Sequence, residues 1–142
     1  MNKSALLGTS LALASAFLAA TPPAHADAMR RIPYARGVLA TGTAHVSYVK
    51  PDGHVYSWGD NTWGELGNGG SGTSAIPQRA SVFTGNVLQV ANGAHFGFAL
   101  TKTGALYGFG RNDVGQVGLA GATKYTTPVQ VISSGIRAVA DG

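Results

Sequence analysis

Oxygen-bearing side chains are concentrated between residues 60 and 65, where the sequence reads DNTWGE. Carboxylate, amide and hydroxyl groups at this density are typical of calcium-binding loops, because Ca²⁺ takes about six to eight oxygen ligands. The spacing of an EF-hand loop is not met, however, and a second copy of the stretch has Arg111 in place of Asp60. The stretch is therefore predicted to be a structural turn, and neither a metal nor a cofactor is expected.

Other residues that could carry chemistry are few. Three histidines follow residue 26, and a zinc site would need three or four converging ligands. His45 and His54 fall on neighbouring strands of one predicted hairpin, where a surface pair is conceivable, but these two and His95 are interpreted as ordinary strand-face residues. The pattern G-x-G-x-x-G at residues 67–72 lacks the following helix that a dinucleotide site requires. No acid–base pair of the kind used in glycoside hydrolysis is evident among the acids, so the chain is predicted not to be an enzyme.

The stretch around residue 60 occurs twice. Residues 57–67, here called the first corner, read SWGDNTWGELG, and residues 108–118, the second corner, read GFGRNDVGQVG. An offset of 51 aligns them without a gap, and the matching pairs are Gly59/Gly110, Asn61/Asn112, Gly64/Gly115 and Gly67/Gly118. Glycine allows positive φ, and Asn bonds its own backbone in turns. These eight residues are therefore predicted to be structural, because one active site does not need two scaffolds.

The corner positions that differ between the copies are the better candidates for binding. Asp60 corresponds to Arg111 and Trp63 to Val114, while Asp113 stands beside Val114 in the second corner. An exposed Trp next to charges of both signs is enriched at protein interfaces. These five residues are predicted to contact a partner, although the packing of Trp63 between the two repeated units is an equal alternative.

The elements that position the corners are predicted to be strands. Short runs rich in branched and aromatic residues are bounded by glycine, and no helical stripe follows the first 26 residues. The predicted strands are 38–41, 45–50, 54–58, 86–91, 97–101, 105–109, 129–132 and 136–140, with hairpin turns at 51–53 and 102–104. Residues 68–76 are expected to be a flexible connector, after which Pro77 and Pro128 each begin a run, as proline does at strand starts. The fold class is all-β with repeated hairpins.

The N-terminal region indicates export. A basic start, an uncharged run from Ala5 to Ala20 and the sequence Ala24-His25-Ala26 form a secretory signal peptide over residues 1–26. A polar, flexible leader is expected over 27–36, and no membrane span is expected once the signal is removed. The sequence contains no cysteine, and its formal net charge of +4 comes from scattered basic residues, so nucleic acid is not expected as a partner.

The motif shared by both copies is Y-x-[WF]-G-x-N-x-x-G-x-[LV]-G with a later proline, starting at Tyr56 and Tyr107. It resembles the regulator of chromosome condensation repeat, and the resemblance covers residues 37–142. It implies β-propeller blades, here two repeats at about 42–92 and 93–141 and the start of a third. The histidine of that repeat matches His45 in the first copy, but in the second copy Phe96 stands there and His95 precedes it.

The resemblance implies binding and not one shared activity. The family's nuclear members act on a small GTPase and on chromatin, whereas a secreted bacterial propeller with similar repeats inhibits β-lactamases. We expect an exported scaffold that binds a protein or an extracellular polymer through its corners. A hydrolase and an inactive fragment of a longer propeller protein are the alternatives. Because a closed propeller takes typically about 4–8 blades, two repeats are expected to be a fragment or to complete a ring as a homo-oligomer.

Overall fold

The computed structural model describes residues 38–140. All of them belong to one unit of the chain, residues 32–142. The predicted signal peptide and the leader lie outside the described residues. Between residues 38 and 140 there is no helix of the length and apolarity that a membrane span requires.

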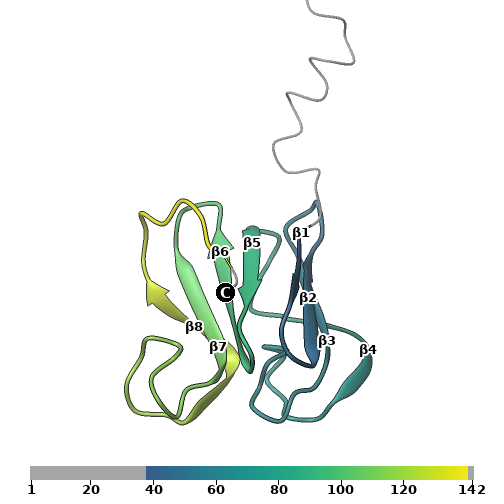
Figure 1. Ribbon diagram of the computed structural model, residues 1–142. Coiled ribbons are helices and arrows are strands. Elements are labelled where there is room, and N and C mark those ends of the chain that lie inside the picture. The colour runs from purple at the N-terminus through teal and green to yellow at the C-terminus, as the bar shows by residue number, and fades with distance from the viewer. Residues whose placement is uncertain (1–37, 141–142) are drawn as a thin grey trace, which may run out of the picture. The chain divides into compact units, whose positions relative to one another are not determined.

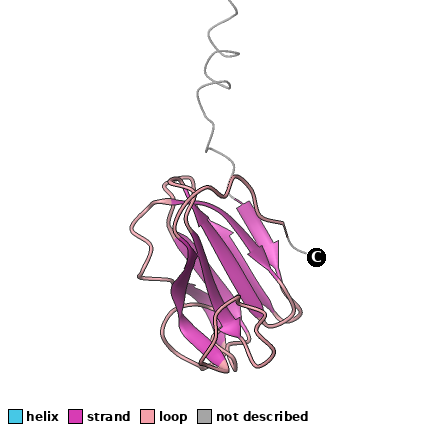
Figure 2. Ribbon diagram, turned by 90° about the vertical axis from the view of Figure 1, so that its left-hand side faces the viewer, coloured by secondary structure: helices cyan, strands magenta, loops and turns pink. Residues whose placement is uncertain are grey.

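Within residues 38–140, eight strands form two antiparallel four-stranded sheets, each in the order of the sequence (Figure 1). The first sheet contains β1 (Val38–Thr41), β2 (His45–Val49), β3 (Val55–Gly59) and β4 (Ser74–Arg79). The second contains β5 (Val87–Asn92), β6 (Phe96–Thr101), β7 (Leu106–Arg111) and β8 (Lys124–Ile132). Strands and loops alone make up the described part of the chain (Figure 2). The all-β prediction is confirmed, and two such sheets form part of a propeller.

The local sequence accounts for the central hairpins. In β2 buried and half-buried residues alternate, as expected for a strand with one face in a core. The turn after β2 closes with the amide of Gly53 donating to the carbonyl of Lys50 at 2.8 Å, and the turn after β6 closes with Gly104 donating to Thr101 at 3.0 Å. Both predicted hairpin turns are therefore present.

The outer strands differ from the prediction. β4 takes up the end of the expected connector, and Pro77 lies inside β4 instead of starting it. Pro128 likewise lies inside β8. Both strands stand last in their sheets, where one side of the backbone has no ladder neighbour and a missing amide donor is tolerated. The residues before Pro77 are rich in glycine and serine, which is typical of a loop, so β4 was not predicted.

The predicted strand 136–140 does not form, because no neighbouring strand within the described residues offers it a ladder. The segment is nevertheless held in place. The amide of Ile136 donates to the carbonyl of Gly104 at 3.1 Å, as Val87 donates to Gly53 at 3.1 Å one repeat earlier. The side chain of Gln89 also donates to the carbonyl of Val139 at 2.6 Å. Ile136 is thus bound at the turn after β6 as Val87 is bound at the turn after β2.

The core lies where the two sheets meet. β5 packs against β1 and β2 (Figure 1). The buried cluster draws on both sheets and contains Ala40, Val49, Val55, Ala80, Phe83, Val87, Val90, Ala99 and Phe109. The amide of Asn92 crosses the junction and donates to the carbonyl of Ala40 and to Ser47 Oγ, each at 3.1 Å. Apolar burial together with these bonds fixes the corners of the two sheets relative to each other.

Candidate functional site

Both corners are built around an asparagine. Asn61 Oδ1 accepts a hydrogen bond from the amide of Leu66 at 3.0 Å, and Asn112 Oδ1 accepts one from Val117 at 3.0 Å. Leu66 and Val117 are fully buried, so each asparagine ties a turn to an apolar anchor. Asn112 also donates to the carbonyls of Leu119 and Ala122, each at 2.8 Å. Each corner is therefore a loop held by side-chain as well as backbone hydrogen bonds.

The equivalent glycines Gly59 and Gly110 lie in strands, whereas the predicted strands ended one residue before each of them. Gly59 is the last residue of β3, and Gly110 lies inside β7. The strand pairing shifts its register directly before each of them, as it does at a β-bulge. A Cβ at Gly59 would lie 2.3 Å from the carbonyl oxygen of Ala44, and one at Gly110 would lie 2.5 Å from that of His95. Both glycines are therefore structural, but they admit a neighbouring backbone at a bulge and do not form the turn itself.

The last glycine of each corner closes the turn but has different surroundings in the two copies. The amide of Gly67 donates to the carbonyl of Gly64 at 3.1 Å, and that of Gly118 donates to Gly115 at 2.9 Å. Gly67 is buried, and a Cβ there would meet the ring of Pro128 in β8 at 3.1 Å. Gly118 is exposed. The two amides thus make equivalent turn bonds, but Gly118 lacks the burial of its counterpart.

The first corner packs on the second sheet. Gly64 has φ +90°, and a Cβ there would meet Thr126 Cα of β8 at 2.6 Å. Close by, the amide of Gly69 donates to the carbonyl of Thr126 at 2.9 Å, and Lys124 Nζ donates to the carbonyl of Thr62 at 3.3 Å. This corner is thus an internal interface between the two repeats.

The second corner has a similar turn but is open. Gly115 has φ +82°, and no atom lies within 4 Å of a Cβ built on it. The neighbouring Val114 is 83% exposed, the most exposed of the large hydrophobic side chains within residues 38–140. The two corners thus have similar turns, but the first corner packs on β8 and the second corner is exposed.

Three of the predicted binding residues come together between the corners. The guanidinium of Arg111 lies 4.8 Å from the centre of the half-buried Trp63 ring. Asp113 Oδ1 accepts from Arg111 Nε and from Gln116 Nε2, both at 2.9 Å. The bonds from Arg111 and then from Gln116 lower the pKa of Asp113 to about 2. Trp63 thus packs between the repeats and also borders the open corner.

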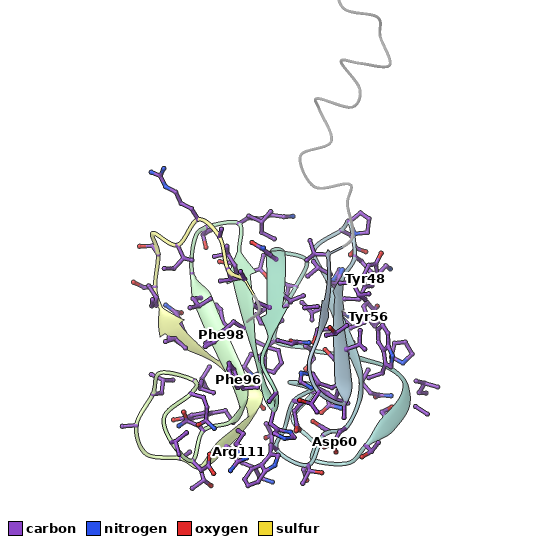
Figure 3. The ribbon with its side chains drawn as sticks, in the orientation of Figure 1. Tyr48, Tyr56, Asp60, Phe96, Phe98 and Arg111 are labelled. Atoms are coloured by element: carbon purple, nitrogen blue, oxygen red, sulfur yellow. The ribbon has the colours of Figure 1, made fainter. Side chains whose placement is uncertain are left out.

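Asp60 takes part in a different group. Asp60 Oδ1 accepts from Thr62 Oγ1 at 2.8 Å and from Thr73 Oγ1 at 3.3 Å, and the bond from Thr62 is the main reason why its pKa is lowered. Figure 3 shows Asp60 and Arg111 at the same end of the two sheets. The side-chain hydrogen bonds of Asp60 go to Thr62 and Thr73, whereas Arg111 contacts both Trp63 and Asp113.

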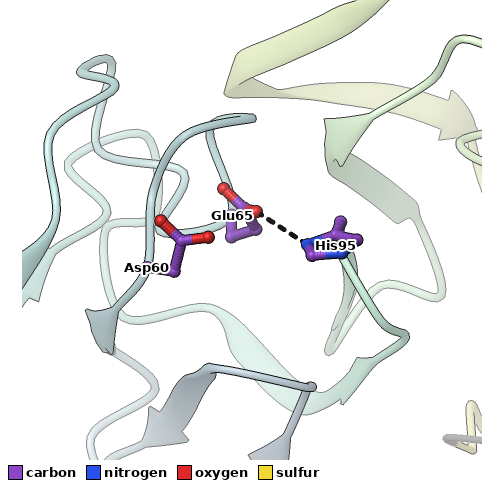
Figure 4. A group of neighbouring side chains, drawn as sticks. All are labelled: Asp60, Glu65 and His95. Carbon is purple, nitrogen blue, oxygen red and sulfur yellow. Dashed lines mark hydrogen bonds and ion pairs between the residues drawn. The ribbon is translucent and has the colours of Figure 1, made fainter.

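Asp60 instead faces two residues that sequence reasoning treated separately. Glu65 Oε1 lies 3.3 Å from His95 Nδ1, and one donor atom from each of Asp60, Glu65 and His95 lies within 4.8 Å of the other two (Figure 4). Asp60 and Glu65 lie in the loop after β3 of the first sheet, and His95 lies between β5 and β6 of the second sheet. The sequence contains one signal for this group: each member differs from the residue that aligns with it in the other copy. The aligned residues are Arg111, Gln116 and Ala44.

The two remaining histidines are not paired with each other. His45 is 2% exposed, burial lowers its pKa, and its Nε2 has no hydrogen-bond partner among the described residues. His54 lies in the turn before β3, where its Nδ1 is 3.1 Å from Asp52 Oδ1. The conceivable surface pair is therefore absent, because His45 is not at the surface.

Comparison with known sequences identifies the repeat. The family described as "Regulator of chromosome condensation (RCC1) repeat" matches residues 52–100 and 103–141. The chain is 39% identical over 98 residues to the ultraviolet-B receptor UVR8 of Arabidopsis thaliana, which covers 68% of this chain and 22% of the receptor. It is 37% identical over 92 residues to the human E3 ubiquitin-protein ligase HERC2, covering 64% of this chain and 2% of the ligase. The chain thus spans about a fifth or less of these relatives.

Solved structures give the same fold. Yeast RCC1 (Prp20) bound to Kap60 aligns with a TM-score of 0.60 at 22% identity, covering 73% of this chain and 27% of the yeast chain. A second structure, of Prp20p from Saccharomyces cerevisiae, described with its binding properties to Gsp1p and histones, has 23% identity and a TM-score of 0.58. The alignment covers 65% of this chain and 25% of that one. The repeats, the two corners and these alignments agree, and the chain belongs to the RCC1 repeat family.

Proposed function

We propose that this chain is an exported scaffold that binds another protein through its second corner, with Arg111, Asp113 and Val114 as contacts and Trp63 at their border. The observation that carries the proposal is the different use of two similar loops. The first corner is packed on β8, while the second presents a valine that is 83% exposed. An exposed apolar side chain beside a rigid charged pair is suited to the centre of a small protein interface.

The relatives support binding as the general role. Prp20 was crystallised with Kap60, and its binding to Gsp1p and histones has been described. HERC2 is named a ligase, but this chain matches 2% of it, so that name gives no argument for catalysis by these repeats. A protein is the proposed partner, and an extracellular polymer is the alternative that the experiment below distinguishes. Export rests on the features of residues 1–26.

The binding proposal is tested with a photo-reactive amino acid at position 114 and, as a control, at position 103 in the turn at the other end of the sheet. We expect a discrete cross-linked protein from position 114 alone, when the chain is mixed with envelope and medium fractions of its source organism. The purified partner should bind Val114→Asp at least about tenfold more weakly than the unchanged chain, and Thr103→Asp equally well. The proposal would be refuted if Val114→Asp and Thr103→Asp weakened binding equally, or if the chain bound a polymer and no protein.

Self-association is a second candidate function, and an exposed residue of β4 in the first sheet favours it. Thr127 lies beside Gly69 where the first corner packs on β8, and the equivalent position in β4 is Ile76, which is 66% exposed. The second corner of one copy can therefore dock on β4 of another, as the first corner docks on β8. Light scattering should then show an oligomer that both Val114→Asp and Ile76→Asp dissociate; a monomer at all concentrations would exclude this mode.

A further inference from the structure

The negative charge of Glu65 is not needed to build the first corner. Glu65 Oε2 accepts a hydrogen bond from the amide of Trp63 at 2.8 Å, and Gln116 Oε1 accepts the equivalent bond from Val114 at 3.0 Å. The second corner therefore forms the same turn with a neutral amide. The carboxylate at position 65 must have another role.

The same reasoning applies to its two neighbours. Asp60 aligns with Arg111 and His95 aligns with Ala44, so neither is required by the repeat. All three departures meet at the junction of the two sheets (Figure 4). Carboxylate oxygens and an imidazole nitrogen are the donors that bind zinc and related divalent metals.

The group contains two carboxylates and one histidine. The Glu65 side chain is fully buried, and a buried carboxylate is costly unless it is well paired. Its partner His95 is 34% exposed and stands at 3.3 Å, which is longer than the roughly 2.7–2.9 Å of a strong charge-assisted hydrogen bond. The nearby carboxylate of Asp60 adds repulsion. A divalent cation between these groups would remove both penalties.

The spacing suits a metal better than a hydrogen bond. Two ligands about 2.0–2.1 Å from a tetrahedral zinc ion lie roughly 3.3 Å apart, and Glu65 Oε1 and His95 Nδ1 are separated by 3.3 Å. The whole group fits within 4.8 Å. A modest rotation of the partly exposed Asp60 side chain would bring its carboxylate to the same ion.

Two further buried polar side chains lie near this junction. His45 pairs with Gly59, directly before Asp60, and its Nε2 meets no hydrogen-bond partner among the described residues. The side chain that His45 faces is Asn92, so the two side chains belong with each other and not with the metal group. The donors of that group are Asp60, Glu65 and His95.

We propose that Asp60, Glu65 and His95 bind a divalent transition metal, with Zn²⁺ as the best match, and that the ion joins the first corner to the second sheet. The imidazole favours zinc over magnesium or calcium. Water completes the coordination on the exposed side of His95. Such an ion stabilises the contact between the repeats, independently of any partner bound at the second corner.

The site is tested on the purified chain after treatment with a chelator, by calorimetric titration with ZnCl₂ and by the visible spectrum after addition of Co²⁺. We expect one ion per chain and cobalt absorption bands typical of a low-coordinate site. The informative variants are taken from the repeat itself: Glu65→Gln copies Gln116, and His95→Ala copies Ala44. Each should weaken zinc binding at least about tenfold, while its circular dichroism stays unchanged.

The matched control is His54→Gln, which removes a histidine from the exposed pair with Asp52 at the other turn and should leave zinc binding unchanged. The proposal is overturned if zinc at about 1 mM, a thousand times a micromolar Kd, gives neither binding heat nor a rise in Tm. Zinc affinity that is equal in Glu65→Gln, His95→Ala and the unchanged chain also overturns it. Tighter binding of Ca²⁺ than of Zn²⁺ would refute the choice of metal.

Discussion

Arg111 lies over the ring of Trp63, with 4.8 Å between the guanidinium carbon and the ring centre. The contact joins two corner positions that differ between the repeats and links the loop after β3 to β7 of the second sheet. Attraction between a cation and the face of an aromatic ring favours this arrangement, and water weakens it at exposed sites. Arg111 also donates a hydrogen bond to Asp113. The three side chains therefore form a continuous row, in the order Trp63, Arg111 and Asp113, which holds the border of the open corner in one arrangement.

The charge of Arg111 should be measurable through Asp113. The pKa of Asp113 is about 2, with the bond from Arg111 as its largest cause, so Arg111→Gln should raise this pKa toward the ordinary 3.8. Because the folded-state pKa is depressed, the stabilisation is present above about pH 4 and is lost as the pH falls through about 2. Carboxyl ¹³C chemical shifts measured against pH check this, with Asp52 as an unaffected control. A midpoint that stays near that of the unchanged chain in Arg111→Gln would contradict the contact.

Removal of the Asn112 side chain should destabilise the second corner. It makes three hydrogen bonds, to the carbonyls of Leu119 and Ala122 and from the amide of Val117. At about 1 kcal/mol for each buried bond, Asn112→Ala should lower the free energy of unfolding by roughly 2–3 kcal/mol. Urea denaturation measures this loss. Gln130→Ala, which removes one exposed bond with Tyr107, should change it by less than about 0.5 kcal/mol; similar values for the two variants would argue against a structural role for Asn112.

Alanine at the two equivalent glycines Gly64 and Gly115 separates backbone strain from docking. Both have positive φ, +90° and +82°, but only at Gly64 would a Cβ meet backbone, 2.6 Å from Thr126 Cα. Each variant should lose about 1 kcal/mol through backbone strain, and Gly64→Ala roughly 1–3 kcal/mol more through overpacking. Thermal unfolding of both variants gives the difference, and equal losses would mean that the first corner is not docked on β8.

Local patterns were sufficient to predict the central strands, the hairpin turns and the two corners. Alternating burial in β2 and the glycines of the turns depend on neighbours in sequence, which is the information that a pattern contains. β4 escaped prediction because its strand character comes from pairing with β3, while its own residues are typical of a loop. The predicted strand 136–140 failed for the opposite reason, since its apolar pattern has no ladder partner within the described residues.

The repeat alignment also concealed a difference between equivalent glycines. Gly67 and Gly118 match in sequence and close the same turn, yet Gly67 is buried and Gly118 is exposed. The burial of Gly67 depends on β8 of the following repeat, which brings Pro128 against it. A pattern within one repeat contains no information about which neighbour packs on it, so this difference appears only in the folded chain.

The candidate site was predicted less completely. The contact of Trp63 with Arg111 joins residues that both stood among the candidates, because each differs from its counterpart in the other repeat. Glu65 and His95 were seen as isolated residues, since they lie thirty positions apart and meet only when one corner packs on the next sheet. Comparing each ionisable residue with its repeat counterpart would have selected both, because Gln116 and Ala44 are neutral.

The last prediction concerns Glu65 in the absence of metal. Without a cation, the fully buried carboxylate has only His95 as an ionic partner among the described residues, and replacing such a group by a neutral one of the same shape is often neutral or stabilising. Glu65→Gln keeps the acceptor for the Trp63 amide, as Gln116 does for Val114. In chelator it should therefore unfold at a urea concentration equal to or above that of the unchanged chain, whereas added Zn²⁺ should stabilise only the unchanged chain. A loss of more than about 2 kcal/mol in chelator, comparable to breaking a buried pair, would show instead that the Glu65–His95 ion pair itself holds the repeats together.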